Sequence, residues 1–290
     1  MNNEAPILDR RFVGREYVTA NQEARAEDMI RYARATNENN PLYYDMDHVN
    51  NLLHPPLYPV VFLPDILRQL VDDAEEMNLD ILRVVHAEQE MWWRKQIHPN
   101  EDIITHAKIV NIEQRGSNEI LELHIRCNHD DTTAVEMQYR LLMRGRGRGS
   151  SDSPPQREES SHHPEIISRH SMKVAEDQGK RYAEASGDHN PIHISDEIAK
   201  SVGLPRAILH GLCTMAFASQ AIVEELLDRD PTRLKYMSVR FSKPVLMGET
   251  LTTELFDMKT DKEGMCTVHF ETKNPSGISV LTRGKAEFAT

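Results

Sequence analysis

Residues 211–223 read Gly-Leu-Cys-Thr-Met-Ala-Phe-Ala-Ser-Gln-Ala-Ile-Val, without one charged side chain. The only polar residues in this segment are Thr214, Ser219 and Gln220, and the first acids follow directly after it. A helix that is apolar on every side is buried on every side. The segment therefore predicts a buried central helix, which the surrounding elements must cover.

Short segments of alternating polarity follow this helix. Every second residue is apolar from 237 to 241 and again from 266 to 270. In the first half of the chain we expect strands at 103–110, 120–127 and 135–142. Such alternation is typical of strands with one buried face. Together with the buried helix, it indicates an α+β fold in which a curved antiparallel sheet covers a helix.

The chain contains the same pattern twice. Tyr-Ala-Arg-Ala-Thr at 32–36, followed by Asn-Pro at 40–41, matches Tyr-Ala-Glu-Ala-Ser at 182–186, followed by Asn-Pro at 190–191. The offset is 150 residues in both cases, and further matches have an offset of 148. Two matches at nearly one offset indicate a duplication.

The central helix of the first copy is expected to be degenerate. Pro55, Pro56, Pro59 and Pro64 crowd the stretch where it would begin. A proline inside a helix costs about 3 kcal/mol. We therefore expect this helix to be short or late, over residues 64–77.

Composition divides the chain into three segments. An Arg-Gly run at 144–149 leads into a stretch rich in Ser, Pro and Glu, which is the composition of a solvated linker. We expect a degenerate N-terminal repeat at 1–143, a linker at 144–164 and a C-terminal repeat at 165–290.

Charge and cysteine usage exclude several classes of protein. The formal net charge of -12 argues against a role on nucleic acid or on an anionic membrane. The 3 cysteines have no paired spacing, and the N-terminus shows no signal-peptide core. No stretch is apolar for long enough to span a membrane. We expect a reduced, cytoplasmic protein.

Residues 182–193 place an acid, an amide and an imidazole close together before the buried helix. Asp188, Asn190 and His193 lie where Gly187 and an Asn-Pro pair discourage regular structure. A carboxylate and an imidazole that share one water can deprotonate it and return a proton. The motif predicts general acid–base catalysis, although an Asp followed by Asn-Pro also caps ordinary turns.

These motifs resemble a known family. Tyr182, Ser-Gly-Asp at 186–188, Asn-Pro-Ile-His at 190–193, Ile-Leu-His-Gly-Leu at 208–212 and Val-Arg-Phe-Ser-Lys-Pro-Val at 239–245 stand in order. They are similar to the signature of the MaoC-like (R)-specific 2-enoyl-CoA hydratases, in particular the two-repeat hydratase 2 type. The resemblance is strong over roughly the last 120 residues and weaker before them.

The resemblance implies a double hot-dog fold: two repeats, each a curved antiparallel sheet around a central helix. It implies that the degenerate helix of the N-terminal repeat leaves room for an acyl chain. It assigns the activation of water to Asp188, His193 and Asn190, and the binding of the thioester oxygen to Gly211. The backbone N–H of Gly211 suits an oxyanion because free N–H groups and the helix dipole both favour negative charge there.

The first copy lacks this set of residues. Where the second copy has Asp188 and His193, the first has Glu38 and Tyr43. A carboxyl group without an imidazole partner cannot hold a water at two points in the same way. We therefore expect one active site per chain, in the C-terminal repeat.

Other residues receive smaller roles. Arg240 and Lys243 are candidates for contacts with the phosphates of CoA, although cations on strands and turns are more often solvated. His210 is expected to shape the start of the helix, with catalysis as the lesser alternative. The histidines show no zinc-ligand spacing, so we expect neither a metal nor a cofactor besides the thioester itself.

Three functions remain open from the sequence. The first is reversible hydration of trans-2-enoyl-CoA to (R)-3-hydroxyacyl-CoA, or dehydration of a 3-hydroxyacyl group on an acyl-carrier protein in fatty-acid or polyketide synthesis. The second is a hot-dog acyl-CoA thioesterase, and the third is a non-catalytic acyl-thioester-binding protein. An acyl-CoA or acyl-carrier protein is the expected partner, and a homodimer is compatible with the fold. Chain length, and whether Asp188 or His193 protonates the α-carbon, stay undecided.

Overall fold

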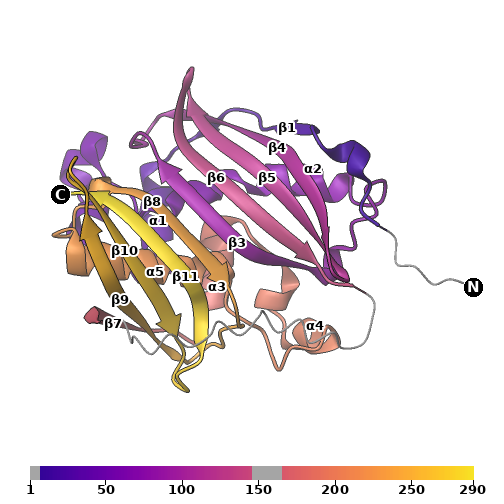
Figure 1. Ribbon diagram of the computed structural model, residues 1–290. Coiled ribbons are helices and arrows are strands. Elements are labelled where there is room, and N and C mark those ends of the chain that lie inside the picture. Colours follow the sequence, from indigo (N-terminus) through magenta and orange to yellow (C-terminus); the bar gives the residue numbers. More distant parts are fainter. Residues whose placement is uncertain (1–6, 146–164) are drawn as a thin grey trace, which may run out of the picture.

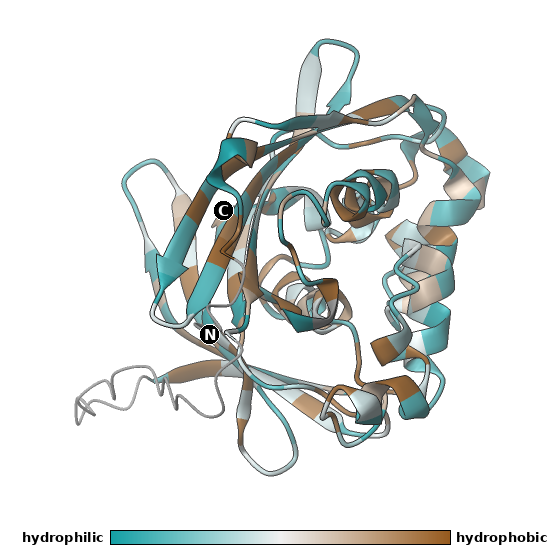
Figure 2. Cartoon of the chain, turned by 90° about the vertical axis from the view of Figure 1, so that its right-hand side faces the viewer, coloured by the Kyte–Doolittle hydropathy of each residue, from teal (hydrophilic) through white to brown (hydrophobic). Residues whose placement is uncertain are grey.

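The fold is a single curved antiparallel sheet with helices on one side. The computed structural model describes residues 7–145 and 165–290, so most of the expected linker at 144–164 lies outside the described residues. In Figure 1 the strands lie in front of the helices, and the side view in Figure 2 shows the sheet curving around them. The α+β prediction is confirmed.

Eleven strands form the sheet. Those of the first half are β1 (Glu16–Val18), β2 (Gln22–Glu23), β3 (Val84–Trp93), β4 (Asp102–Arg115), β5 (Asn118–His129) and β6 (Thr132–Met143). Those of the second half are β7 (Ile166–Lys173), β8 (Leu234–Phe241), β9 (Thr250–Thr260), β10 (Met265–Lys273) and β11 (Ser279–Ala289). All the strands expected from the sequence are present, and each is longer than predicted.

The order of the strands is symmetric about the middle of the sheet. It runs β1-β4-β5-β6-β3-β8-β11-β10-β9-β7, with β2 paired to β4. The central pair, β3 and β8, is antiparallel and places Met91 opposite Met237. Each half of the order is the counterpart of the other half, as a duplicated chain requires. The two repeats therefore share one continuous sheet.

Helices cover the concave side of this sheet. The α-helices are α1 (Ala26–Ala35), α2 (Pro64–Asp72), α3 (Gln178–Ser186), α4 (Asp196–Ser201) and α5 (Gly211–Leu226). The short 3-10 turns are η1 (Arg10–Phe12), η2 (Pro41–Tyr43), η3 (Met46–Asn51), η4 (Tyr58–Phe62), η5 (Ile81–Arg83), η6 (Pro191–His193) and η7 (Pro231–Arg233). No helix among the described residues is long and apolar enough to cross a membrane.

The helix α5 is the buried central helix that the sequence predicts. Residues 213–223 are all buried, and a fully buried Phe217 or Ile222 contributes roughly 1.5–3 kcal/mol each to the stability of the fold. Its hydroxyl groups are satisfied within the helix, because Thr214 donates to the carbonyl of His210 and Ser219 to that of Ala216. The helix can therefore lie in the core without a polar face.

The corresponding helix of the first repeat is short, as expected, but the predicted range of 64–77 is too long. The helix α2 ends at Asp72. The carboxylate of the next residue, Asp73, accepts hydrogen bonds from Arg15 and Tyr17. The chain then continues in turns to Asn78, whose φ of 60° cannot continue a helix. The helix thus ends before its sequence pattern does, at a residue whose side chain makes a tertiary contact.

The two repeats meet through equivalent residues. The hydroxyl groups of Tyr32 and Tyr182, which lie 150 positions apart, are 3.4 Å from each other. Both helices that carry these tyrosines end in a left-handed residue: Asn37 has a φ of 56° and Gly187 a φ of 77°. The side chain of Asn37 donates to Gln178 of the other repeat over 2.9 Å. The helix α3, which immediately precedes the acid–base motif, therefore forms part of the interface between the repeats.

Candidate active site

The loop after α3 is shaped by side chains that bind its own backbone. Ser186 accepts from the N–H of Asp188, Asp188 accepts from that of Asn190, and Asn190 accepts from that of Ile192, over 3.1–3.3 Å. At Gly187 a Cβ atom would lie 2.7 Å from the ring of Pro64 in α2. Both the lack of space for a Cβ and the positive φ favour glycine at this position.

Three acid–base groups converge at this loop. One polar atom each of Asp188, His193 and His210 lies within 4.8 Å of the others. The rings of His193 and His210 stack with centroids 3.9 Å apart. The structure thus brings together Asp188 and His193, which the sequence singled out, and adds His210, for which the sequence favoured a structural role and left catalysis as the lesser alternative.

The hydrogen bonds of His193 fix which ring nitrogen is free. Nδ1 lies 2.9 Å from the carbonyl oxygen of Ile208, and because a carbonyl only accepts, Nδ1 carries the proton in the neutral ring. Nε2 is then a free base. Burial lowers the pKa of His193, and the Asp188 carboxylate and the Ile208 carbonyl oppose this effect. The ring is therefore neutral and ready to accept a proton at neutral pH.

His210 ties the loop to the buried helix. It precedes the first residue of α5, and its Nε2 lies 3.0 Å from the backbone carbonyl of Asp188. Burial and the neighbouring His193 lower the pKa of His210 to about 3, so Nε2 keeps its proton as a donor in the neutral ring. His210 also packs on Tyr182, with ring centroids 4.8 Å apart. Proximity to Gly211 in the sequence was the only signal for this role.

Asn190 and Gly211 lie on either side of these groups. The side-chain oxygen of Asn190 caps the turn η6, so this residue has the turn-forming role that the sequence left open as the alternative. Gly211 begins α5, where the first N–H groups have no partner within the helix. A Cβ at Gly211 would lie 3.1 Å from the ring of Phe241. Glycine therefore allows Phe241 to cover the start of the helix.

Arg240 and Lys243 lie at the end of β8. Because neighbouring side chains of a strand point to opposite faces, Arg240 lies on the face of the sheet away from Phe241 and Gly211. Lys243 is exposed just after the strand. Lys243 is therefore the one of these two cations that lies outside the strand, two residues beyond Phe241.

The groups at this loop are of kinds that also bind divalent metals. Asp188, His193 and His210 offer a carboxylate and two imidazoles, which are common zinc ligands. One nitrogen of each ring already contacts a backbone carbonyl. A metal would therefore compete with the free base of His193 for the same lone pair.

The first repeat holds a counterpart of this loop with different side chains. Glu38 and Tyr43 are both buried, and neither Glu38 Oε1 nor the Tyr43 hydroxyl has a hydrogen-bond partner among the described residues. Burial, with repulsion from Glu224, raises the pKa of Glu38 to about 8 against the attraction of Arg229. The acid is thus protonated at neutral pH and has no imidazole beside it.

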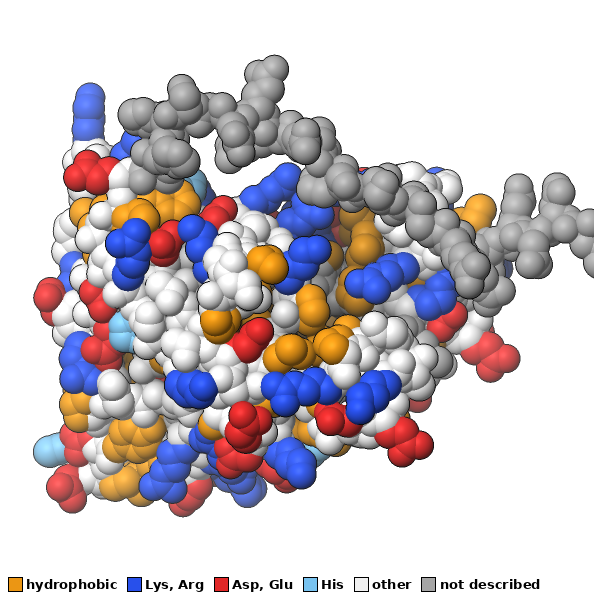
Figure 3. Space-filling model, turned by 90° about the horizontal axis from the view of Figure 1, so that it is seen from below, with side chains coloured by type: hydrophobic (Ala, Val, Ile, Leu, Met, Phe, Trp, Pro, Cys, Tyr) orange, Lys and Arg blue, Asp and Glu red, His pale blue; other side chains and the backbone are white. Residues whose placement is uncertain are grey.

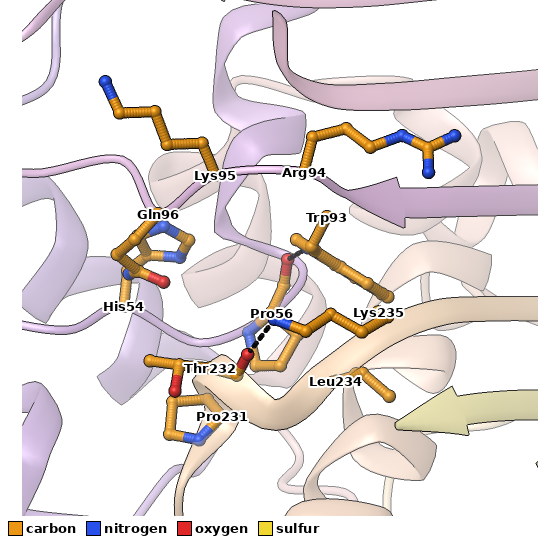
Figure 4. Close-up of a pocket in the computed structure, with 10 residues that line it drawn as sticks. All are labelled: His54, Pro56, Trp93, Arg94, Lys95, Gln96, Pro231, Thr232, Leu234 and Lys235. Carbon is orange, nitrogen blue, oxygen red and sulfur yellow. Dashed lines mark hydrogen bonds between the residues drawn. The ribbon is translucent and has the colours of Figure 1, made fainter. Parts of the chain in front are cut away.

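A small pocket of about 120 Å³ opens between the end of β3 and the start of β8, and residues of both repeats line it. Trp93, Arg94 and Lys95 line it, and in the duplication they align with residues 241–243. Figure 4 shows that Arg94, Lys95 and Lys235 point in different directions, while the Trp93 N–H donates to Pro56. Because these charges do not converge, the pocket has no focus for an anion.

Comparison with known sequences places the chain in a family. The profile of the MaoC like domain matches residues 158–277, and that of the FAS1-like dehydratase domain region matches residues 11–135. A probable enoyl-CoA hydratase 2 of Dictyostelium discoideum is 32% identical over 240 residues, which cover 79% of this chain and 77% of that protein. The chain therefore belongs to the MaoC-like dehydratase family.

Other relatives agree with this assignment. The peroxisomal enoyl-CoA hydratase 2 of Arabidopsis thaliana is 31% identical over 63% of this chain, and the match spans 63% of that protein, a little under two thirds. The crystal structure of a MaoC-like dehydratase from Phytophthora capsici superimposes with a TM-score of 0.80 over 98% of both chains, at 23% identity. A double hot-dog protein of Mycobacterium tuberculosis has a TM-score of 0.62 over 95% of both chains, at 12% identity. The double hot-dog prediction is confirmed.

The buried acid of the first repeat generates a prediction about stability. The pKa of Glu38 is raised from 4.5 to about 8 in the folded protein. Between these two pH values the folded state binds a proton that the unfolded state has lost, so the free energy of unfolding decreases as the pH rises from 4.5 towards 8. The substitution Glu38→Gln removes this loss. We expect the melting temperature of the variant to exceed that of the wild type by an amount that grows between pH 5 and pH 8. A difference that is constant over this range would contradict the buried, protonated state.

Proposed function

We propose that the protein is a hydro-lyase that adds water reversibly to trans-2-enoyl-CoA and forms (R)-3-hydroxyacyl-CoA. The observation that carries the proposal is the convergence of the Asp188 carboxylate and the free Nε2 of His193 beside the start of α5. A base for the water and a donor for the thioester oxygen are the two devices that this reaction needs. Membership of the MaoC-like family supports the same chemistry.

The reaction follows from the electronic demand of the substrate. The β-carbon of a 2-enoyl thioester accepts a nucleophile only while the carbonyl oxygen can take up negative charge. In the proposed step, the oxygen of a water held by Asp188 and His193 bonds to the β-carbon, and its proton goes to one member of the pair. The electrons of the double bond move into the thioester carbonyl, and the α-carbon then takes a proton from the site.

The thioester oxygen is proposed to bind at the N-terminus of α5. The N–H of Gly211 is free of intrahelical bonds and lies at the positive end of the helix dipole. Removing a comparable oxyanion donor lowers kcat by about 10²–10³. His210 is a positioning residue in this scheme, because it joins the backbone of Asp188 to the first turn of this helix.

The two repeats are proposed to divide the substrate between them. Residues 165–290 supply the reacting groups and residues 1–143 accommodate the acyl chain beside the shortened helix α2. The face seen from below in Figure 3 carries many Lys and Arg side chains among acidic and apolar ones, although the whole chain is acidic. This supports binding of an anionic thioester, and we propose Lys243 rather than Arg240 as a phosphate contact.

A second form of the same activity is dehydration of 3-hydroxyacyl thioesters, including those on an acyl-carrier protein. A relative from Mycobacterium tuberculosis named 3-hydroxyacyl-thioester dehydratase Y is 35% identical over 162 residues. The two directions use the same groups by microscopic reversibility. Comparing the kcat/KM values for a CoA thioester and for the same acyl group on a carrier protein distinguishes the two carriers.

The acid–base pair is tested by two substitutions. Asp188→Asn and His193→Ala should each lower the kcat of crotonyl-CoA hydration by about 10²–10⁴, since each removes a group that moves a proton in the transition state. The matched control is Tyr43→Phe, at the counterpart of His193 in the first repeat, which should leave kcat nearly unchanged. Circular dichroism checks that all three variants fold. Retention of more than about a tenth of wild-type kcat in either active-site variant would refute the assignment.

The burial of His193 sets the pH dependence. Because burial lowers its pKa, the free base should persist below the usual value of about 6.5, and activity should fall only in more acidic solution. We expect the acidic limb of kcat/KM against pH to have its midpoint below 6.5. A midpoint at 7 or above would show that another group, or a protonated His193, controls the reaction.

The stereochemistry of the product tests the whole geometry. Asp188 and His193 flank one water from one loop, so the hydroxyl group and the proton should reach the same face of the double bond. Chiral chromatography of the product formed from 2-enoyl-CoA should give the (R)-alcohol predominantly. Predominance of the (S)-alcohol would overturn the proposal, and release of free CoA without a 3-hydroxyacyl product would assign the protein to the thioesterases.

A further inference from the structure

A second set of polar side chains lies in the first repeat, on the two strands beside the centre of the sheet. Gln89 of β3 and Tyr139 of β6 are directly opposite each other in the antiparallel register. The ring of His86 stacks on that of Tyr139, with centroids 4.5 Å apart. We call these three residues the His86–Gln89–Tyr139 cluster.

A β-bulge brings His86 into this cluster. Residues 86 and 89 are three positions apart, so in a regular strand their side chains would point to opposite faces. The pairing of β3 with β6 shifts by one residue between His86 and Glu88. Bulges of this kind redirect a side chain and occur often beside functional sites. The local backbone thus departs from regular geometry in a way that places His86 beside Tyr139.

Each member of the cluster has an unsatisfied polar atom in the interior. Within the described residues, His86 Nε2, Gln89 Oε1 and the Tyr139 hydroxyl are buried and make no hydrogen bond of standard geometry, although the side chains of His86 and Gln89 lie close enough to interact. The side-chain amide of Gln89 donates to the carbonyl of Glu90 over 2.9 Å. Buried polar groups are nearly always paired, and three unpaired ones in contact need an explanation.

The cluster borders the proposed active site through one aromatic ring. Phe241 packs against His86 with centroids 4.8 Å apart, and the same ring covers Gly211 at the start of α5. The carboxylate of Asp188 is close enough to act on the cluster electrostatically. Burial lowers the pKa of His86 to about 4, and the backbone of Glu88, the side chain of Gln89 and the Asp188 carboxylate oppose this effect. Burial raises the pKa of Tyr139, with a further contribution from Asp188.

We propose that the His86–Gln89–Tyr139 cluster is a polar subsite that selects 2-enoyl thioesters whose acyl chain carries a hydroxyl group. This inference rests on the proposed function, because it concerns the chain of the same substrate. A hydroxyl group both donates and accepts, so it can donate to Gln89 Oε1 and accept from the Tyr139 hydroxyl. A plain alkyl chain would leave both atoms unpaired and dry.

The size of the preference follows from the cost of unpaired groups. Sites built to hydrogen-bond a substrate hydroxyl reject the analogue that lacks it more strongly than apolar pockets distinguish a methylene group. One unpaired buried group corresponds to about a 10-fold change in kcat/KM. The cluster therefore predicts at least about a 10-fold preference for the hydroxylated chain over an alkyl chain of the same length.

The test compares isosteric substrates in a small set of variants. The substrates are 6-hydroxy-2-hexenoyl-CoA and 2-heptenoyl-CoA, with the pairs one carbon shorter and one carbon longer to vary the reach of the hydroxyl group. Tyr139→Phe removes one hydroxyl group, Gln89→Met removes the side-chain amide, and both substitutions nearly keep the side-chain volume. The control is Tyr43→Phe, which removes another buried and unpaired hydroxyl group that is not part of the cluster.

We expect the wild type and Tyr43→Phe to prefer the hydroxylated member of at least one pair by about 10-fold or more. In Tyr139→Phe and Gln89→Met this ratio of kcat/KM values should fall about 10-fold, with melting temperatures near that of the wild type. A ratio near one in the wild type for every pair, or equal losses for both members of a pair in the variants, would overturn the subsite.

Direct binding separates this inference from the proposed function. Calorimetry with the saturated thioesters 6-hydroxyhexanoyl-CoA and heptanoyl-CoA measures the same preference without any reaction. A protein that binds the hydroxylated thioester about 10-fold more tightly but hydrates no enoyl-CoA would keep the subsite and refute the hydratase. A protein that hydrates both chains and binds them equally would keep the hydratase and refute the subsite.

Discussion

The antiparallel pairing of β3 with β8 is the contact on which the other features depend. It joins two curved sheets into one and makes the order of strands symmetric about its centre. The same pairing brings β3, which carries His86, beside β8, which carries Phe241. His86 of the first repeat thereby contacts Phe241, the ring that covers the start of the central helix of the second repeat. The proposed site is thus bordered by both repeats, although its proposed acid–base groups come from one.

Duplication followed by divergence accounts for the differences between the two repeats of the shared sheet. The backbone is nearly the same in both copies: each has a helix with a left-handed cap, then an Asn-Pro turn, then a connection to a second helix. The side chains differ. The second copy places a carboxylate close to an imidazole, whereas the first buries Glu38 with its Oε1 unpaired among the described residues. Burial and repulsion from Glu224 outweigh the attraction of Arg229 and keep this acid neutral, which is compatible with a structural position and unsuited to activating water.

The central helices diverged in a related way. An apolar sequence without proline allows α5 to run for 16 residues through the core. Prolines delay α2, which ends after 9 residues next to Asp73, whose side chain contacts Arg15 and Tyr17. The first repeat thus has less helix in the concave side of its sheet. In the proposed function this difference corresponds to the division between a reacting repeat and a repeat that holds the chain.

Local patterns in the sequence determined the strands, the buried helix and the positions of Asp188 and His193. They could do so because alternation, continuous apolarity and turns at glycine or proline each act over a few residues. The duplication was also visible, as a repeat of such local patterns. Only the tertiary structure decided the rest. His210 reaches Asp188 across 22 positions of sequence, and Asn190 proves to be engaged in capping its own turn. The His86–Gln89–Tyr139 cluster depends on a bulge and on the register of paired strands. Such long-range pairings depend on burying the apolar faces of several strands and helices at once. No pattern over a few residues can therefore predict which side chains they bring into contact.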